Sequence, residues 1–308
     1  MEDSIPSLPA WHSAWARTPS SMEELWSDIG WLSFSVGTNS RFVWRGLPDD
    51  SFLVESSLAR ALRQVGIAPT EEAIRYNEER MIASARRWGL GHSEFGYASD
   101  LHLLAMMQHH GVPTRLVDVT YNPLTALWFA CADPSRASSP GVLVAMAVAA
   151  VPVIETVPVV PHATYGSIAD PLSYDLHRAL SESQRDQLPF LVEPVVRDSR
   201  MTAQEGLFIA SSTPSESAGT PMEGFPYEGS WVLLSTLLEM RDMGTRIVGS
   251  AWPSFGLLGL IISPSLKAQI LPVLENSFNR TARSMYPDLA GFARENFDFA
   301  QPTVADEH

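Results

Sequence analysis

Only one cysteine and one lysine, Cys131 and Lys267, occur among the 308 residues of this sequence. A single cysteine cannot form an intrachain disulfide, which fits a reducing compartment. The first six residues lack the basic start and the apolar run of a signal peptide. The longest apolar stretch, residues 141–154, is too short to span a bilayer and contains Pro152. We therefore expect a cytoplasmic protein with no membrane partner.

Basic side chains are scarce as a class. The sequence has 21 basic against 35 acidic residues, which gives a formal net charge of −14. Such a field repels a phosphate backbone, so general nucleic-acid binding is not expected unless a local basic groove overrides it. Small anionic ligands are not excluded, because a few well-directed arginines suffice to bind them. The content of 45% hydrophobic and 18% charged residues is that of an ordinary globular protein.

Several common catalytic motifs are missing. The sequence contains no phosphate-binding P-loop, no GxSxG nucleophile elbow, no CxxC pair and no protein-kinase signature. Cys131 has no neighbouring base in the sequence, so we interpret it as a small buried hydrophobic residue. These absences remove many frequent enzyme classes.

Hydrophobic periodicity predicts a mixture of helices and strands. Helices are expected from about Ser20 and over residues 70–88, 100–110, 123–132 and 264–276. Thr70 and Ser263 are the expected caps of two of them, and Asn122-Pro123 starts another. Strands are expected over residues 41–46, 114–120, 204–209 and 256–262, with one or two more within residues 141–160. Residues 161–200 look irregular, and residues 211–229 look loop-like. Without an internal repeat or a clear linker, this pattern predicts an α+β fold, a mixed β-sheet core with flanking helices.

Residues Phe42 to Gly46 read FVWRG, and Val54 to Arg60 follow them. These segments are similar to those of the FRG domain family, which is named for a Phe–Arg–Gly signature. The most specific stretch runs from Met107 to Thr120 and continues through Asn122 to Ala130. The later family marks are Arg200 to Phe208 and Tyr286 to Gly291. The resemblance implies a single FRG domain over residues 1–308, with its core at about 20–295 and short polar termini.

A looser resemblance connects the chain with ADP-ribosyltransferase-like folds. In those folds a strand arginine holds the phosphate or ribose of NAD, a hydroxyl residue orients the nicotinamide ribose, and a late glutamate stabilises the developing cation. The matching positions here are Arg45, Thr120, and Gln204 or Glu205. The usual Ser-Thr-Ser is replaced by Asp118-Val119-Thr120, and Gln204-Glu205-Gly206 replaces the usual Glu-x-Glu. Adjacent strand residues face opposite sides, so the carboxylate is missing from the site if Gln204 is the inward residue.

The densest polar cluster lies within residues 108–120. A histidine such as His109 with Asp118 is a reasonable general acid–base pair, and a hydrogen-bonded network that fixes the turn after the helix is the alternative. The candidate catalytic residues are Glu205, Gln204, Thr120 and His109. The candidate ligand-binding residues are Arg45, Gly46, Gln108, His110, Thr114, Arg115, Asp118 and Arg200.

Each of these candidates has a structural alternative. Gly46 would let a ligand approach the backbone beside Arg45, whose own alternative is an ion pair with Asp118. Arg115 and Arg200 contact an anionic ligand or serve buried ion pairs. His102 lies seven residues before His109 on one helix face, but two histidines are too few for zinc, so we expect no metal.

The resemblance implies an NAD-binding protein that transfers ADP-ribose to a protein or nucleic-acid acceptor, or that hydrolyses NAD. A role as an intracellular toxin or antiphage effector would suit that chemistry, by analogy alone. The mechanism implied places Arg45 on the pyrophosphate, Thr120 on the ribose and Glu205 beside the cation, and it requires all three to converge in one cleft. The alternatives are a non-catalytic nucleotide sensor and a protein-interaction module whose polar cluster is structural.

Overall fold

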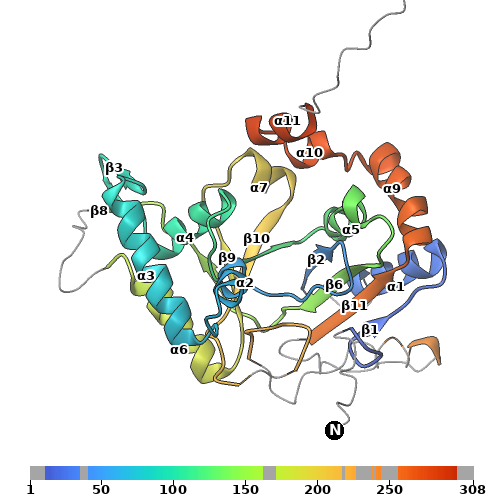
Figure 1. Ribbon diagram of the computed structural model, residues 1–308, viewed down its shortest axis with the longest axis horizontal. Coiled ribbons are helices and arrows are strands. Elements are labelled where there is room, and N and C mark those ends of the chain that lie inside the picture. Colours follow the sequence, from blue (N-terminus) through green and yellow to red (C-terminus); the bar gives the residue numbers. More distant parts are fainter. Residues whose placement is uncertain are drawn as a thin grey trace, which may run out of the picture.

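Eight strands form one mixed sheet in the part of the chain that the computed structural model describes, residues 11–34, 41–161, 171–216, 219–226, 238, 241–243 and 256–296 (Figure 1). The strand order is β1 (Ala16–Arg17), β11 (Gly256–Ile262), β6 (Gly141–Ala147), β2 (Phe42–Leu47), β5 (Val117–Thr120), β10 (Gly206–Ala210), β9 (Phe190–Glu193) and β7 (Val153–Glu155). The outer pairs β1–β11 and β7–β9 are parallel, and the other pairs are antiparallel. A small second sheet joins β3 (His92–Ser93), β4 (Gly96–Tyr97) and β8 (Val160–Pro161).

Two groups of helices cover one face of the large sheet. The first group, α1 (Met22–Phe34), α5 (Pro123–Cys131) and α9 (Pro264–Phe278), packs on β2, β6 and β11. The second group, α3 (Glu71–Arg87), α4 (Asp100–His109) and α6 (Tyr174–Asp186), packs on β9 and β10. The pairing of Trp44 with Thr120 and of Thr120 with Gly206 places Trp44 and Phe208, one from each core, on the same face. The opposite face is covered by Trp11, Trp15, Met222 and Phe225 from irregular segments.

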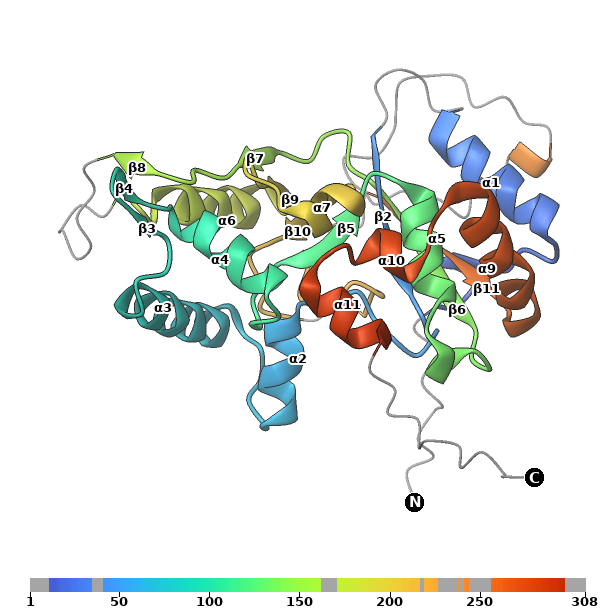
Figure 2. The same ribbon diagram turned by 90° about the horizontal axis from the view of Figure 1, so that it is seen from above.

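The described part of the fold also contains shorter helices. They are α2 (Ser57–Gln64), α7 (Ser199–Ala203), α10 (Ala282–Met285), α11 (Leu289–Asn296) and the 3₁₀ turn Pro134–Arg136. Figure 2 shows α10 and α11 lying between α4 and α5, and α10 contacts α7. The C-terminal helices therefore lie between the two main helix groups.

The α+β prediction is confirmed, and several elements begin where their capping residues indicated. The side chain of Thr70 accepts a hydrogen bond from Ala73 N at the start of α3, and Asn122 caps α5 in the same way through Leu124 N. Strand β11 spans the predicted residues 256–262. No helix in the described ranges is both long enough and apolar enough to cross a membrane.

Two sequence predictions were wrong. Residues 161–200 are not irregular throughout, because α6, β9 and the start of α7 lie there, with Ser173 and Asp198 in the N-cap positions of the two helices. Strand β10 begins at Gly206 rather than at residue 204, because Gln204 is the C-cap of α7 and Glu205 has a positive φ of 50°. Alternation along a strand therefore does not decide which of Gln204 and Glu205 faces the site.

The sheet opens between β2 and β5. The two strands share one recorded pair, Trp44 with Thr120, although both are fully described. Further along β2, the guanidinium of Arg45 donates from Nη1 to the backbone oxygen of Asp118, so a side chain bridges the two strands. On the helix side of this opening, a β-carbon at Gly46 would overlap the carbonyl oxygen of Ala126. Helix α5 thus lies directly against the backbone of β2.

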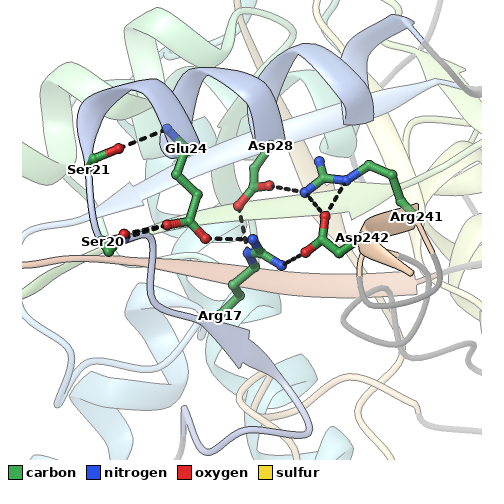
Figure 3. A network of polar contacts seen from close by, with 7 residues as sticks. All are labelled: Arg17, Ser20, Ser21, Glu24, Asp28, Arg241 and Asp242. Atoms are coloured by element: carbon green, nitrogen blue, oxygen red, sulfur yellow. Dashed lines mark hydrogen bonds and ion pairs between the residues drawn. The ribbon is translucent and has the colours of Figure 1, made fainter. Parts of the chain in front are cut away.

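An ion network fastens the N-terminal part of the chain (Figure 3). Asp28 of α1 is fully buried, with its carboxylate 2.9 Å from Arg17 Nε and 2.7 Å from Arg241 Nη2. Arg17 also pairs with Glu24 and Asp242. Burial raises the pKa of the Asp28 carboxyl, against the opposing effect of the two guanidinium groups. The network joins β1 and residues 241–242 to α1 across more than two hundred positions of sequence.

The single cysteine and the single lysine are both buried, on helices of the first group. Lys267 on α9 donates from Nζ to Pro48 O at 2.7 Å and to Arg136 O at 3.1 Å, and burial lowers its pKa. Burial raises the pKa of the Cys131 thiol to about 12. The interpretation of Cys131 as a buried hydrophobic residue is therefore confirmed.

Candidate functional site

A cavity of about 680 Å³ lies where β2 and β5 diverge, which is a usual volume for a small-molecule site. Its walls come from β2, β5 and β10, from the ends of α4, α5 and α7, and from the residues at the start of α11. The sequence-predicted residues that line it are Arg45, Gly46, Gln108, His109, His110, Asp118, Thr120, Arg200 and Gln204. Thr114, Arg115 and Glu205 are not among the lining residues.

Arg45 lies in the opening of the sheet with part of its guanidinium unpartnered. Nη1 donates to Asp118 O, whereas the buried Nε has no hydrogen-bond partner among the described residues. Burial lowers the pKa of Arg45, which Asp118 opposes and Arg60 reinforces. The site thus holds a partly desolvated cation, and an anion placed beside it would offset that cost.

Gln108 and Asp118 form a fixed polar pair at the other side of the opening. Gln108 Nε2 donates to Asp118 Oδ2 at 2.9 Å, and Gln108 Oε1 accepts from Thr114 Oγ1 at 2.9 Å and from Ser57 Oγ at 3.1 Å. These hydroxyl donors determine which end of the amide faces Asp118. Thr114 therefore acts behind Gln108, as a support for a residue of the cavity wall.

His109 does not pair with Asp118. Its Nε2 lies 2.9 Å from Asp198 Oδ2, and Asp198 in turn caps α7 by accepting a hydrogen bond from Met201 N. Burial lowers the pKa of His109, against the attraction of Asp198, so the imidazole is neutral at neutral pH. His110 follows at the exposed end of α4, with its ring 5.1 Å from that of His109. The pairing of His109 with Asp118 that the sequence suggested is not seen, and the carboxylate that contacts His109 is that of Asp198.

Arg200 reaches the cavity from α7. Its guanidinium carbon lies 4.5 Å from the centre of the Tyr286 ring, a cation–π contact. Within the described ranges no carboxylate forms an ion pair with it, although Asp288 also lines the cavity. Of the two fates considered for Arg200, a buried ion pair is thus not the one seen.

Thr120 and Gln204 are joined by a direct hydrogen bond and do not face each other across open space. Thr120 Oγ1 donates to Gln204 O at 2.8 Å and accepts from Asn122 N at 3.0 Å. The side chain of Gln204 lines the cavity and donates from Nε2 to Met285 O at 2.9 Å. The hydroxyl that we matched to ribose binding is thus already hydrogen-bonded within the turn.

Glu205 points away from the cavity. Its Oε1 accepts from Asn122 Nδ2 at 2.8 Å and from Arg280 Nη2 at 3.1 Å, and its side chain is 46% exposed. Glu205 has a positive φ and follows the C-cap residue Gln204, and of the two only Gln204 lines the cavity. Arg45, Thr120 and Glu205 therefore do not converge in one cleft, and the mechanism that required their convergence is not supported.

Arg115 is held in a buried ion network. Its guanidinium lies 2.6 Å from Glu78 Oε2 and 3.1 Å from Glu71 Oε1, and it donates to Ser211 O. Burial acts to lower the pKa of Arg115, but the two carboxylates more than offset it. Of the two fates considered for Arg115, the structure therefore shows the buried ion pair, and Arg115 does not line the cavity.

Gly46 lines the cavity and also has a packing role. The residue must be glycine because Ala126, Phe129 and Ala130 of α5 lie against it. Close approach of the helix therefore requires glycine at this position, and contact with a ligand stays a prediction.

Three residues of the site were missed by sequence reasoning: Thr125, Asp198 and Asp288. Thr125 is fully buried, lines the cavity, and its hydroxyl lacks a partner among the described residues. Asp198 could have been found as a helix cap three residues before Met201, and Asp288 as part of the Tyr286 to Gly291 mark. His102, the other candidate zinc ligand, is bonded to Thr156, and the described ranges hold no cluster of three metal-binding side chains.

Comparison with known proteins gives one assignment. No curated protein and no solved structure matches the chain. The family model of the FRG domain matches residues 40–139, a range that holds Arg45, Gly46 and the polar cluster of residues 108–120. Arg200, Gln204, Glu205 and Asp288 lie outside this match, which is narrower than the core at 20–295 that the motifs implied. The chain is therefore similar to the FRG domain family over residues 40–139.

Proposed function

We propose that the cavity binds a nucleotide-class anion and that NAD is its first candidate ligand. The observation that carries the proposal is the pair of arginines in one cavity: Arg45 with its buried, unpartnered Nε, and Arg200 with no ion-pair partner among the described residues. Guanidinium groups present donors in the planar arrangement that phosphate oxygens accept. A pyrophosphate carries two phosphate groups, one for each guanidinium.

The remaining walls suit the other parts of such a ligand. Phe129 and Phe208 give the cavity apolar surface on which a base can pack. Asp118 and Gln108 offer hydrogen-bond acceptors and donors at its rim, which suit a ribose diol. A protein of net charge −14 needs such a local arrangement to bind an anion at all.

Cleavage of NAD is the catalytic form of this proposal. The bond between ribose C1′ and the nicotinamide nitrogen breaks, nicotinamide leaves with the bonding electrons, and water or an acceptor attacks C1′ and loses a proton. Glu205 lies outside the cavity, so in this form of the proposal the carboxylate beside the cation is Asp118.

Non-catalytic sensing of a nucleotide is the second candidate. It is favoured by the position of Gln204, an amide, on the cavity wall where the related folds carry a glutamate. An amide can hydrogen-bond a ligand but cannot neutralise a developing cation.

The test measures binding and turnover together. We expect NAD or ADP-ribose to raise the unfolding free energy by about 2.7 kcal/mol at a concentration one hundred times Kd. Arg45→Gln and Arg200→Gln should each abolish most of this shift, whereas the exposed Arg178→Gln on α6 should not change it. Calorimetric unfolding with each ligand gives the result.

Nicotinamide release separates the two forms of the proposal. Release by the native protein at saturating NAD, lost in Asp118→Asn but retained in Glu205→Gln, would support cleavage. Binding without release, with and without cell lysate as a source of acceptors, would support the sensor. No stabilisation by any nucleotide tested would contradict both.

A further inference from the structure

We propose that Glu205 and Arg280 are positioning residues: their ion pair holds residues 280–289 in place as the C-terminal wall of the cavity. The proposal rests on the nucleotide site proposed above and assigns a role to the carboxylate that lies outside it. It also extends the site beyond residues 40–139, the range of the FRG match.

Three contacts connect α7 and the turn after it with the C-terminal wall. Glu205 Oε1 lies 3.1 Å from Arg280 Nη2, Gln204 Nε2 donates to Met285 O at 2.9 Å, and the guanidinium carbon of Arg200 lies 4.5 Å from the Tyr286 ring centre. All three come from residues 200–205 and reach residues 280–286, where α10 contacts α7. The latch therefore consists of one ion pair, one hydrogen bond and one cation–π contact.

The Glu205 carboxylate also holds a second element. Its Oε1 accepts from Asn122 Nδ2 at 2.8 Å, while Asn122 Oδ1 caps α5 by accepting from Leu124 N at 2.9 Å. One oxygen atom thus connects the start of β10, the start of α5 and the C-terminal wall. Thr125 and Ala126, one turn into α5, line the cavity that these elements enclose.

The wall contributes directly to the cavity. Asp288 and Leu289 line it, and Asp288 Oδ1 accepts from Gly291 N at 2.6 Å, which fixes the carboxylate at the start of α11. Tyr286 supports the guanidinium of Arg200, one of the two anion-binding groups of the proposed site. Releasing the wall therefore removes one side of the cavity and the support of one arginine.

A double-mutant cycle tests the latch. Glu205→Gln and Arg280→Gln should each weaken the binding of ADP-ribose about fivefold, measured by titration calorimetry. The double variant should be no weaker than either single variant, because both remove the same pair. Glu182→Gln, which breaks the Arg178–Glu182 pair on α6, is the matched control and should leave Kd unchanged. Hydrogen exchange in peptides covering residues 280–292 should quicken in the first three variants and not in the control.

A second readout needs no ligand. Thr125→Cys places a thiol on the cavity wall at a hydroxyl that has no partner in the described ranges, so little is lost. The native Cys131 is buried with a pKa of about 12 and gives no background. We expect iodoacetamide to modify the new thiol about fivefold faster when Glu205→Gln or Arg280→Gln is added, because the wall then opens more often.

The outcomes distinguish the positioning role from the proposed nucleotide site on which it rests. If Glu205→Gln weakens ADP-ribose binding and Arg280→Gln does not, Glu205 contacts the ligand and the positioning role is overturned. If exchange and thiol modification are unchanged in both variants, no latch exists. If the native protein binds no ADP-ribose but both wall readouts respond, the nucleotide site fails while the latch is upheld.

Discussion

Gly46 and Gly206 line the same cavity but differ in the space around them. A β-carbon at Gly46 would overlap the backbone of α5, whereas at Gly206 the nearest atom, Met201 O, lies 3.6 Å away. Neither residue has a positive φ, so the comparison isolates packing from backbone strain. The loss of stability on substitution by alanine at the two positions therefore measures how closely α5 packs on β2.

We expect Gly46→Ala to lower the free energy of unfolding by about 3 kcal/mol, because helix and strand must move apart. Gly206→Ala should change it by less than about 1 kcal/mol. Denaturant unfolding of the two variants checks this. Equal, small effects would show that α5 can shift freely away from β2.

At the level of helices and strands, capping and turn residues predicted more than periodicity did. Thr70, Asn122 and Ser263 each begin a helix where their side chains indicated. The strand predicted from residue 204 begins two residues later. An apolar pattern does not indicate where the backbone leaves the extended conformation, and Glu205 has a positive φ. Helix α2 was missed because its eight residues are too few for a clear period.

The candidate site was predictable as a list of residues but not as a set of contacts. The glycine and arginine of the FRG signature and most of the polar cluster line one cavity, whereas Thr114 and Arg115 do not. The carboxylate that pairs with each arginine comes from a segment far away in the sequence. Arg115 pairs with Glu78 of α3, and Glu205 pairs with Arg280 near the C-terminal end. No spacing in the sequence encodes these partners.

The Arg115 network joins three elements: α3, the approach to β5 and the segment after β10. We expect Glu78→Gln to lower the free energy of unfolding by about 3–5 kcal/mol, because a buried guanidinium is left with a partial partner. Glu182→Gln, which breaks the solvent-accessible Arg178–Glu182 pair of α6, should cost less than about 0.5 kcal/mol. Chemical denaturation of the two variants measures both losses. Similar losses of unfolding free energy would mean that burial of Arg115 is not costly.

For the whole molecule, pH acts on two histidines that are held neutral. Burial lowers the pKa of both His102 and His109 from the ordinary value of 6.5. Above that value both states are neutral and the histidines contribute no pH dependence. As the pH falls below it, the unfolded chain takes up protons first, so the folded protein loses stability.

We therefore expect the free energy of unfolding to fall between about pH 7 and pH 5, by up to about 1.4 kcal/mol per pH unit for each histidine. His102→Gln should reduce this slope, and His102→Gln with His109→Gln should reduce it further. Denaturant unfolding across this range measures the slope. A slope unaltered by both substitutions would assign the acid sensitivity to other groups.

Lys267, the one lysine of the sequence, donates hydrogen bonds from its ammonium group to two backbone carbonyls beneath α9. The folded surface therefore offers no lysine side chain to acylating enzymes, to ubiquitin-like tags or to amine-directed cross-linkers. A cell that marks this protein through lysine would first have to unfold it, so modification at that residue would report on damage rather than on regulation.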